Sequence, residues 1–337
     1  MSATALVYRS TDPGAPQLAG LPGSLTSLLD AVLVNGYGVG ATAKAGAGWK
    51  IAFSGSGRRV YRNDTSSGSG TYLQVDDSGS DSRIARVRAY ETMSAMDVGT
   101  GPCPTLAQSS EGRIWVKSGS TDSEVRNWLA IATRTSIYFF TSANGVSEEG
   151  YERVALMPHF AGDISSHKEG DPSRFMLMDN AYAFYETGFV NGFTVPAGHW
   201  GNPDVMPGVG VGNLIRSFTL KDGAVPAAIA KSGIGTYSSD RLALGGVGAP
   251  FPDPVTDGLL LERALVCEGP GVVRGYLPGV YVPLHVRPFA DCEIVNDVAG
   301  VDGAVLMAKA TYGASGSRPV GNQGYFGQFL FDLSTPW

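Results

Sequence analysis

The feature that most constrains this chain is a series of short, strand-like runs separated by turn segments rich in glycine and serine. The runs WKIAFSG, RRVYRND, TYLQVDD and SRIARVRAYE begin at Trp49, Arg58, Thr71 and Ser82. The glycines between them tolerate positive φ, and the Asp and Ser side chains there bond to nearby backbone. Runs this short and this closely joined predict an antiparallel meander.

The last of these runs, RIARVRAY, assigns its residues to two faces, because side chains alternate along a strand. One face is predicted to hold Ile84, Arg86, Arg88 and Tyr90, and the other to hold Arg83, Ala85, Val87 and Ala89. The first face carries two arginines. We therefore expect it to meet water or to lie in an interface.

Strand-like runs continue to the end of the chain. They are GRIWVKSG, NWLAIATRTSIYFFTS, RFMLMDN, NLIRSFTL, GLLLERALVCEG, VVRGYLPGVYVPLHV, AVLMAKATYG and YFGQFLFDLS. The second of these is long enough for a hairpin that turns at Thr133-Arg134-Thr135, and its aromatic residues 138–140 suit a buried sheet. The predicted fold class is mainly β, with antiparallel, sandwich-like sheets and few short helices.

One helix is predicted near the N-terminus, over Ser24–Val34. Its apolar residues have the i, i+3, i+4, i+7, i+8 spacing of one helical face: Leu25, Leu28, Leu29, Val32 and Leu33. Ser24 or Ser27 can cap its start, and Asn35-Gly36 supplies a left-handed residue at its end. We expect this helix to cover one face of the sheet that contains residues 138–140.

The length of 337 residues predicts two domains, because single cores stop growing near roughly 250 to 300 residues. We place them at 1–150 and 151–337, the second with a long irregular loop over 181–213 that is rich in Pro and Gly. The C-terminal Trp337 is expected to pack against the protein. No repeat of fixed period occurs in the sequence, which argues against solenoids and propellers.

The charge pattern disfavours several classes of partner. A net charge of −6 offers no field that attracts nucleic acid or an anionic membrane. No secretory leader and no long apolar run are recognisable, so we expect synthesis in the cytoplasm and no membrane span. Only 17% of residues are charged and 46 are glycine, so we expect small uncharged side chains to cover the surface, a composition that favours assembly with other proteins.

Histidines and cysteines provide the candidates for metal or redox chemistry. His159 and His167 flank Asp163 in HFAGDISSHKEGD, which also holds Glu169 and Asp171. The spacing matches no known metal motif, so a polar loop joining two strands is preferred over a metal or base site; His199 and His285 stand alone. The cysteines Cys103, Cys267 and Cys292 form no CxxC pair and are predicted to be free thiols.

Other motifs that resemble catalytic or phosphate-binding sites are better explained as turns. They are Gly55-Ser56-Gly57, Gly313-Ala314-Ser315-Gly316, the glycine cluster Gly208–Leu214 and the acidic pairs Asp76-Asp77 and Glu148-Glu149. Cys103 lacks the neighbouring His and helix start that a catalytic thiolate needs. We predict no catalytic, cofactor-binding or metal-binding residues, and expect that the protein is not an enzyme.

Several blocks of the sequence carry a resemblance to a known group. These are VYRSTDPGAPQLAGLPGSLTSLLDAVLVNGYG, GWKIAFSGSGRRVYRND, YLQVDDSGS with ARVRAYETMS, HFAGDISSHKEGD, and RGYLPGVYVPLHVRP. In their order they resemble uncharacterised structural proteins of tailed bacteriophages. The resemblance implies a virion component, located at the tail tip, baseplate or neck, with a head-decoration role as the next alternative. Its partners are then other virion proteins and copies of itself.

Two further hypotheses stay open beside a structural role. A receptor- or glycan-binding tail protein would use the aromatic residues Trp200, Tyr276 and Tyr281, and a depolymerase would need convergent acid and base groups. For the structural role, segments Ser2–Leu21 and Asn191–Asn213 are predicted to carry much of the contact between subunits.

Overall fold

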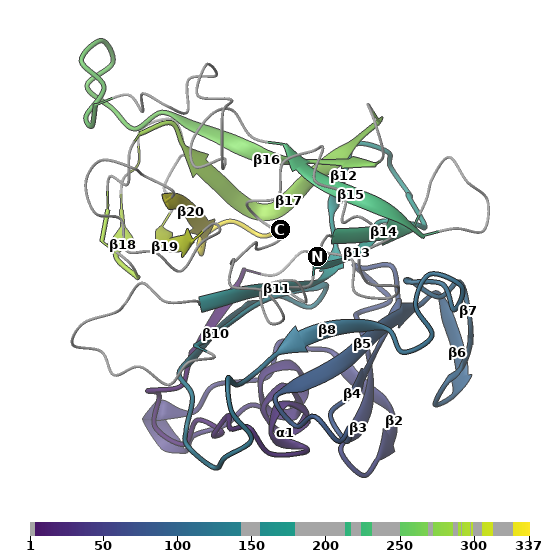
Figure 1. The fold of residues 1–337 in the computed structure, drawn as a ribbon. Coiled ribbons are helices and arrows are strands. Elements are labelled where there is room, and N and C mark those ends of the chain that lie inside the picture. Colours follow the sequence, from purple (N-terminus) through teal and green to yellow (C-terminus); the bar gives the residue numbers. More distant parts are fainter. Residues whose placement is uncertain are drawn as a thin grey trace.

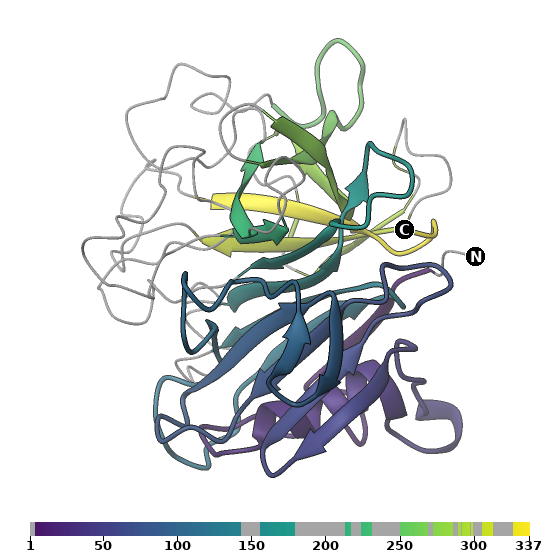
Figure 2. The same cartoon turned by 90° about the vertical axis from the view of Figure 1, so that its right-hand side faces the viewer.

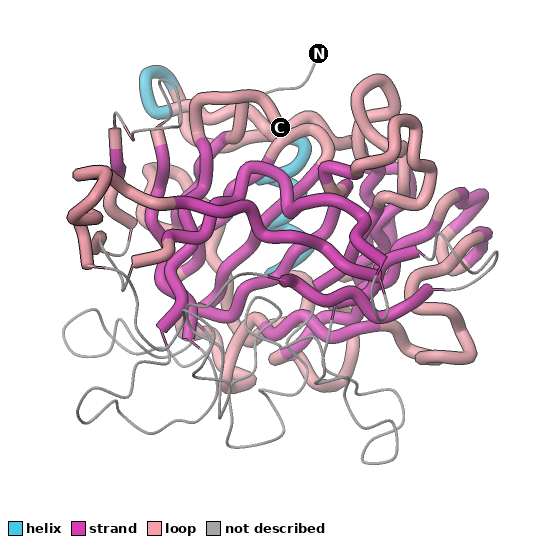
Figure 3. Tube along the Cα trace, turned by 90° about the horizontal axis from the view of Figure 1, so that it is seen from above, coloured by secondary structure: helices cyan, strands magenta, loops and turns pink. Residues whose placement is uncertain are grey.

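The structure is a computed structural model that describes residues 4–142, 156–178, 213–216, 224–230, 250–268, 272–285, 289–290, 292–296, 298, 305–312 and 326–337. It is built mostly of antiparallel β-sheets, and the helical turns of the described chain fall between residues 24 and 42 (Figures 1 and 3). The predicted fold class is confirmed. None of the described helices has the length and apolar character that a membrane span requires.

The predicted meander is confirmed and forms most of a five-stranded sheet. Its order is β2 (Lys50–Gly55), β3 (Arg58–Arg62), β4 (Tyr72–Asp76), β5 (Ile84–Tyr90) and β8 (Arg113–Val116), all antiparallel. A small hairpin of β6 (Thr92–Ala95) and β7 (Val98–Thr100) follows β5 and projects from this sheet (Figure 1).

A second, larger sheet has 13 strands within the described residues. In spatial order its first members are β1 (Leu6–Arg9), β9 (Trp128–Ala132), β10 (Ser136–Ser142), β11 (Leu156–Asp163) and β13 (Phe175–Met178). It continues through β14 (Asn213–Arg216), β15 (Ala224–Ala230), β16 (Leu261–Glu268), β17 (Val272–Pro283), β20 (Phe326–Asp332), β19 (Leu306–Tyr312) and β18 (Ile294–Val295), and β12 (Ser165–Ser166) pairs with β17. The hairpin predicted at Thr133-Arg134-Thr135 joins β9 to β10.

Strands β9, β10, β11 and β13 form a central layer that is buried on both faces. Ala130 and Phe139 belong to one apolar cluster, whereas Ile131 and Tyr138 belong to a second cluster on the opposite face. Figures 1 and 2 show the consequence: the N-terminal elements lie below this layer, and the strands β14 to β20 lie above it. Fully buried strands explain why these runs read as continuously apolar in the sequence.

The helix is confirmed and covers the lower face of the central layer. It consists of α1 (Ser24–Leu29) followed by a π-helical turn, η1 (Asp30–Asn35), and a short 3₁₀ turn, η2 (Gly40–Thr42), comes after it. All five predicted apolar residues are fully buried, in the cluster that also contains Phe139 and the inner face of the five-stranded sheet. Gly36 ends the helix with φ 75°, as predicted, and its amide donates to the carbonyl of Ala31 at 2.8 Å.

The predicted serine cap of this helix is wrong. The N-cap residue is Gly23, with φ 80° and no side chain to accept a bond. The hydroxyls of Ser24 and Ser27 donate instead to the carbonyls of Ala19 and Gly23. The carboxylate of Asp77, which lies at the end of β4, accepts the Leu25 amide at 2.8 Å, so a residue distant in sequence performs the capping.

Five strands of the larger sheet, β1, β11, β12, β15 and β18, lie outside the predicted runs. The most informative is β11, because the sequence HFAGD at its end was interpreted as part of a polar loop. The division at residue 150 lies outside the described residues and stays a prediction, although β10 and β11 pair across it. The packing of Trp337 is confirmed: its indole N–H donates to the Asp332 carbonyl at 2.7 Å.

Candidate functional site

The predicted histidine candidates do not converge. His159 is fully buried, where its Nε2 accepts the Val116 amide at 3.1 Å and its Nδ1 lies 3.3 Å from the Phe139 carbonyl. Because Nε2 accepts, Nδ1 carries the proton and the imidazole is neutral. His285 is bonded in the same way: its Nε2 accepts the Leu260 amide, and its Nδ1 lies close to the Pro250 carbonyl.

His167 is exposed on the turn after β12, edge-on to the ring of Tyr276, and His199 lies outside the described residues. Within the described parts of the chain, no group of three or more His, Cys, Asp or Glu residues is arranged to hold a metal ion. The histidines that the structure does describe therefore lie at separate places in the fold.

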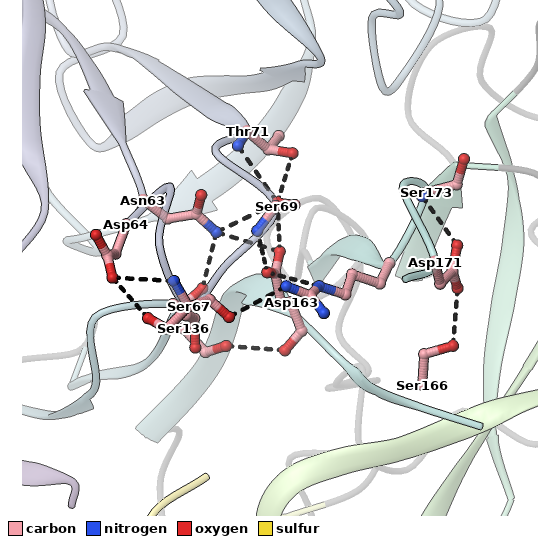
Figure 4. Close-up of polar contacts among 12 residues, drawn as sticks. Asn63, Asp64, Ser67, Ser69, Thr71, Ser136, Asp163, Ser166, Asp171 and Ser173 are labelled. Carbon is pink, nitrogen blue, oxygen red and sulfur yellow. Dashed lines mark hydrogen bonds and ion pairs between the residues drawn. The ribbon is translucent and has the colours of Figure 1, made fainter. Parts of the chain in front are cut away.

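Asp163, the central acid of that predicted cluster, anchors a loop of the N-terminal half (Figure 4). Its carboxylate accepts the Ser69 amide and hydroxyl at 2.6 Å each, the Asn63 amide group at 3.1 Å and Arg174 Nε at 3.0 Å. Burial raises the pKa of Asp163, although these donors act to lower it. The contacts tie the loop between β3 and β4 to the end of β11.

Asp64, in the same loop, behaves in the opposite way. It is partly exposed and accepts hydrogen bonds from the hydroxyls of Ser66 and Ser67, which lower its pKa to about 2. A hollow of about 140 Å³ lies beside Asp163, lined in part by Ser67, Arg174 and Trp337. This volume is below the roughly 300 Å³ at which small-molecule sites begin.

Asp171 belongs to a second buried network, on β16 and β17. Arg274 donates to Asp171 at 2.7 Å and to Glu268 at 2.5 Å, and Ser166 donates to Asp171 at 2.8 Å. Burial acts to raise the pKa of Asp171, but the hydrogen bonds, above all that from Arg274, bring it below the usual value. Asp163 and Asp171 therefore fix two different loops rather than one shared site.

The prediction that Asp77 lies in a solvated turn is wrong. Its side chain is fully buried and forms an ion pair with Lys117, which also donates to the Leu21 carbonyl. Burial raises the pKa of Asp77 and lowers the pKa of Lys117, while their attraction opposes both shifts. Asp76, its neighbour, is partly exposed and pairs with Arg58 at 2.8 Å. Glu148 and Glu149 lie outside the described residues.

The remaining predicted motifs have structural explanations where the structure describes them. Gly55-Ser56-Gly57 forms the turn between β2 and β3, as expected. None of the three cysteines, all of which the structure describes, forms a disulfide; Cys103 is buried, and its backbone exchanges hydrogen bonds with that of Ala89. The segments 313–316 and 208–212 lie outside the described residues.

Two of the three predicted aromatic residues flank an arginine. The guanidinium carbon of Arg263, on β16, lies 5.5 Å from the ring centroids of both Tyr276 and Tyr281 on β17. Both tyrosines are half-buried rather than fully exposed, and Arg263 is exposed. Trp200 lies outside the described residues. The arrangement offers a cationic, aromatic surface on the C-terminal half.

Sequence reasoning missed a groove over the outer face of the five-stranded sheet. It has a volume of about 550 Å³. Its charged and amide lining residues come from β3, β4 and β5 and from three flanking segments: Arg58, Gln74, Asp76, Asp81, Arg86, Arg88, Asp97 and Glu111. We call it the outer groove. The alternation in RIARVRAY indicated the face, but it could not show that other segments wall it in.

The hairpin β6–β7 forms one wall of the outer groove. Asp97, at its turn, has φ 63°, and its carboxylate accepts hydrogen bonds from Arg58 Nη2 at 2.7 Å and from the Gln74 side-chain amide at 2.6 Å. The backbone amide of Asp97 donates in return to Gln74 Oε1 at 3.0 Å. Hydrogen bonds from Arg58 and Gln74 lower the pKa of Asp97, with burial opposing them. The hairpin is thus held against the sheet by polar contacts.

Segment 104–112 forms the other wall, and Arg88 holds it in place. Arg88 is 5% exposed, and its guanidinium donates to the carbonyls of Pro104, Ser109 and Ser110 at 2.6–3.3 Å. Burial lowers the pKa of Arg88. At the rim, Glu111 pairs with Arg86 at 2.8 Å.

Comparison with known proteins finds no matching family model and no matching curated protein.

Proposed function

We propose that the protein is a structural component of a tailed-bacteriophage particle, located at the tail tip, baseplate or neck and assembled in the host cytoplasm. The observation that carries the proposal is the use of its buried charges. The buried ion pairs Lys117 with Asp77 and Arg274 with Asp171 join residues that are 40 and 103 positions apart in the sequence. Such ties favour a rigid subunit. The proposal assigns no catalytic activity.

Exposed apolar side chains on loops support the same role. Val39 and Val255 are 83% and 90% exposed, and Leu106, on a wall of the outer groove, is 64% exposed. A neighbouring subunit can cover such side chains on assembly. The first strand of the larger sheet, β1, and the first strand of the five-stranded sheet, β2, also leave one edge unpaired among the described strands, where a partner strand can bind.

The predicted contact segments are only partly described. Within residues 4–21, Tyr8 and Leu18 are fully buried in the protein's own core, whereas Leu21 is 42% exposed. Contacts with other subunits would then come from the exposed residues of this segment. Residues 191–212 lie outside the described chain. Hydrogen exchange on free and assembled protein tests both segments, and equal protection in the two states argues against their role.

The test of the proposal is to locate the protein in purified particles. We expect peptides of this chain in density-gradient-purified virions at a stoichiometry that repeats between preparations, and antibody labelling at one end of the tail or at the neck. A cytoplasmic host protein is the control for carry-over. Labelling over the head surface would favour head decoration instead. Absence from washed particles would refute a structural role.

A host-receptor or glycan-binding tail protein is the second candidate function. It is favoured by Arg263 and its two flanking tyrosines, because aromatic faces with a neighbouring cation suit ligands that have both apolar and polar surface. Binding of the purified protein to whole host cells tests it. We expect the variant Tyr281→Ala to bind cells more weakly than the wild type, whereas equal binding would argue against this surface.

A further inference from the structure

We propose that the outer groove binds an uncharged oligosaccharide. The inference concerns ligand binding alone, so it goes beyond the structural role and holds whether or not the protein is part of a particle. It also uses a surface in the N-terminal half, separate from the tyrosines of β17.

The floor of the outer groove is a ladder of polar side chains set by strand register. Arg58, Asp76 and Arg86 are direct cross-strand neighbours on β3, β4 and β5, and in the next row Gln74 lies beside Arg88. Side chains in register stand about 5 Å apart on one face. The floor therefore presents alternating donors and acceptors at the regular spacing of neighbouring strands. Their attachment to the paired strands limits their movement.

Sugar hydroxyls match such a floor because each one donates and accepts at the same time. The arginines supply donors and the carboxylates supply acceptors with lone pairs beyond those used in the ion pairs. Arg88 also lines the groove, and its hydrogen bonds to the carbonyls of Pro104, Ser109 and Ser110 come from its two terminal nitrogens rather than from Nε. A ligand hydroxyl can accept a hydrogen bond from Nε.

The charge of the lining favours an uncharged ligand. Three arginines and four carboxylates line the groove, and Arg58 and Arg86 are already paired with carboxylates. An anionic chain would have to compete with these carboxylates, and a cationic ligand would meet the arginines. The side chains of Tyr90 and Leu106 add apolar surface for the C–H faces of a sugar ring.

The shape of the groove also fits a small ligand. Its volume of about 550 Å³ lies within the roughly 300 to 1,000 Å³ of small-molecule sites. Both walls are held to the sheet by the contacts of Asp97 and Arg88, so the site is formed before binding. Preformed walls reduce the entropy lost when a ligand is ordered.

The experiment measures binding of the full-length protein to a panel of neutral oligosaccharides of glucose, galactose, mannose, rhamnose and N-acetylglucosamine. A matched panel contains uronic and sialic acids. We expect at least one neutral member to bind, and Arg86→Gln and Asp76→Asn each to weaken that binding at least tenfold. Circular dichroism and thermal unfolding of each variant establish that it is folded. Lys50→Gln, an exposed cation on the same sheet that does not line the groove, is the control and should bind as the wild type does.

Three outcomes overturn the proposal: no neutral member binds, only acidic members bind, or binding survives both groove variants. Loss of binding in Arg263→Gln but not in Arg86→Gln would assign saccharide binding to the tyrosine surface instead. Incorporation of the Arg86→Gln protein into particles is scored separately. A failure of the structural role can thus be told apart from a failure of this inference.

Discussion

The two faces of the five-stranded sheet use the same strands for opposite purposes. The inner face presents Tyr61, Leu73, Val75 and Val87 to the helix and the central layer, in one apolar cluster. The outer face presents the polar ladder of the outer groove, with a small apolar patch around Val60 and Tyr90 beside it. Alternation along each strand separates the two sets, since every second side chain changes face.

The difference shows where stability and binding are located in this half of the molecule. Burying an apolar side chain stabilises the fold by about 1.5–3 kcal/mol, whereas an exposed ion pair contributes about 0–1 kcal/mol. The inner face can therefore supply the stability of the sheet, so that outer residues such as Arg86 are available to contact a ligand. Asp77 and Arg88 are the exceptions, because each is a buried charge, one at the inner face and one on the outer face.

The largest expected loss of stability comes from removing the buried ion pair at the end of the inner face. Lys117→Met leaves the Asp77 carboxylate buried without its partner, which typically costs about 3–5 kcal/mol of unfolding free energy. Urea unfolding measures the loss. The double variant Lys117→Met with Asp77→Leu should recover part of it, because both charges are then removed. Lys50→Met is the exposed control, and a single variant no less stable than this control would contradict the assignment.

The next effect tests the apolar part of the inner face. Leu73→Ala removes a fully buried side chain and should destabilise the protein by about 2–5 kcal/mol, since the cavity cannot collapse completely. Val98→Ala on β7, where the side chain is 54% exposed, should change the unfolding free energy by less than about 0.5 kcal/mol. Similar losses in the two variants would mean that the inner face is not the stabilising one.

A smaller effect is expected at the buried arginine of the outer face. Arg88→Met removes the donors to the carbonyls of Pro104, Ser109 and Ser110, and unsatisfied buried groups cost about 1–3 kcal/mol. Hydrogen exchange should show faster exchange in segment 104–112, with little change in β3 and β4. Unchanged exchange in 104–112 would show that Arg88 does not hold this wall.

The smallest effect is a difference in titration between the two faces. Asp97 should titrate below the ordinary value of 3.8 because Arg58 and Gln74 donate to it, whereas burial should move Asp77 above 3.8. The stability from Asp97 is present above pH 3.8 and is lost as pH falls through its lowered pKa. The contribution of Asp77 has the opposite sign: it is present below pH 3.8 and is lost as pH rises through its raised pKa. Carboxyl ¹³C NMR measures both, and a reversed order would contradict this account.

Local pattern was a good guide wherever one strand or helix determined the outcome. The meander, the hairpin at residues 133–135, the alternation in β5 and the buried stripe of the helix were all predicted, because periodicity reports directly which side chains share a face. The sequence indicated only part of the outer groove. Its floor follows from alternation, but its walls depend on Asp97 and Arg88 reaching segments outside their own strands.

Predictions failed where a polar residue found its partner far along the chain. Asp77 has the sequence context of a turn, yet it pairs with Lys117, 40 residues away. His159 was read as part of a loop, although β11 is buried between neighbouring strands and the histidine serves the backbone of β8 and β10. Polar residues in a buried strand resemble the sequence of a loop, because the sequence does not show the buried groups to which they hydrogen-bond.

The sequence by itself determined the strands, the helix and the faces that they bury, because local backbone preference and the periods of 2 and 3.6 residues are properties of neighbouring residues. Only the tertiary structure decided which charges are buried, which segment caps the helix and where the outer groove is walled. Those outcomes depend on contacts between residues 21 to 100 positions apart, such as Arg88 with Ser109, Lys117 with Asp77 and Asn63 with Asp163, and no local pattern encodes them.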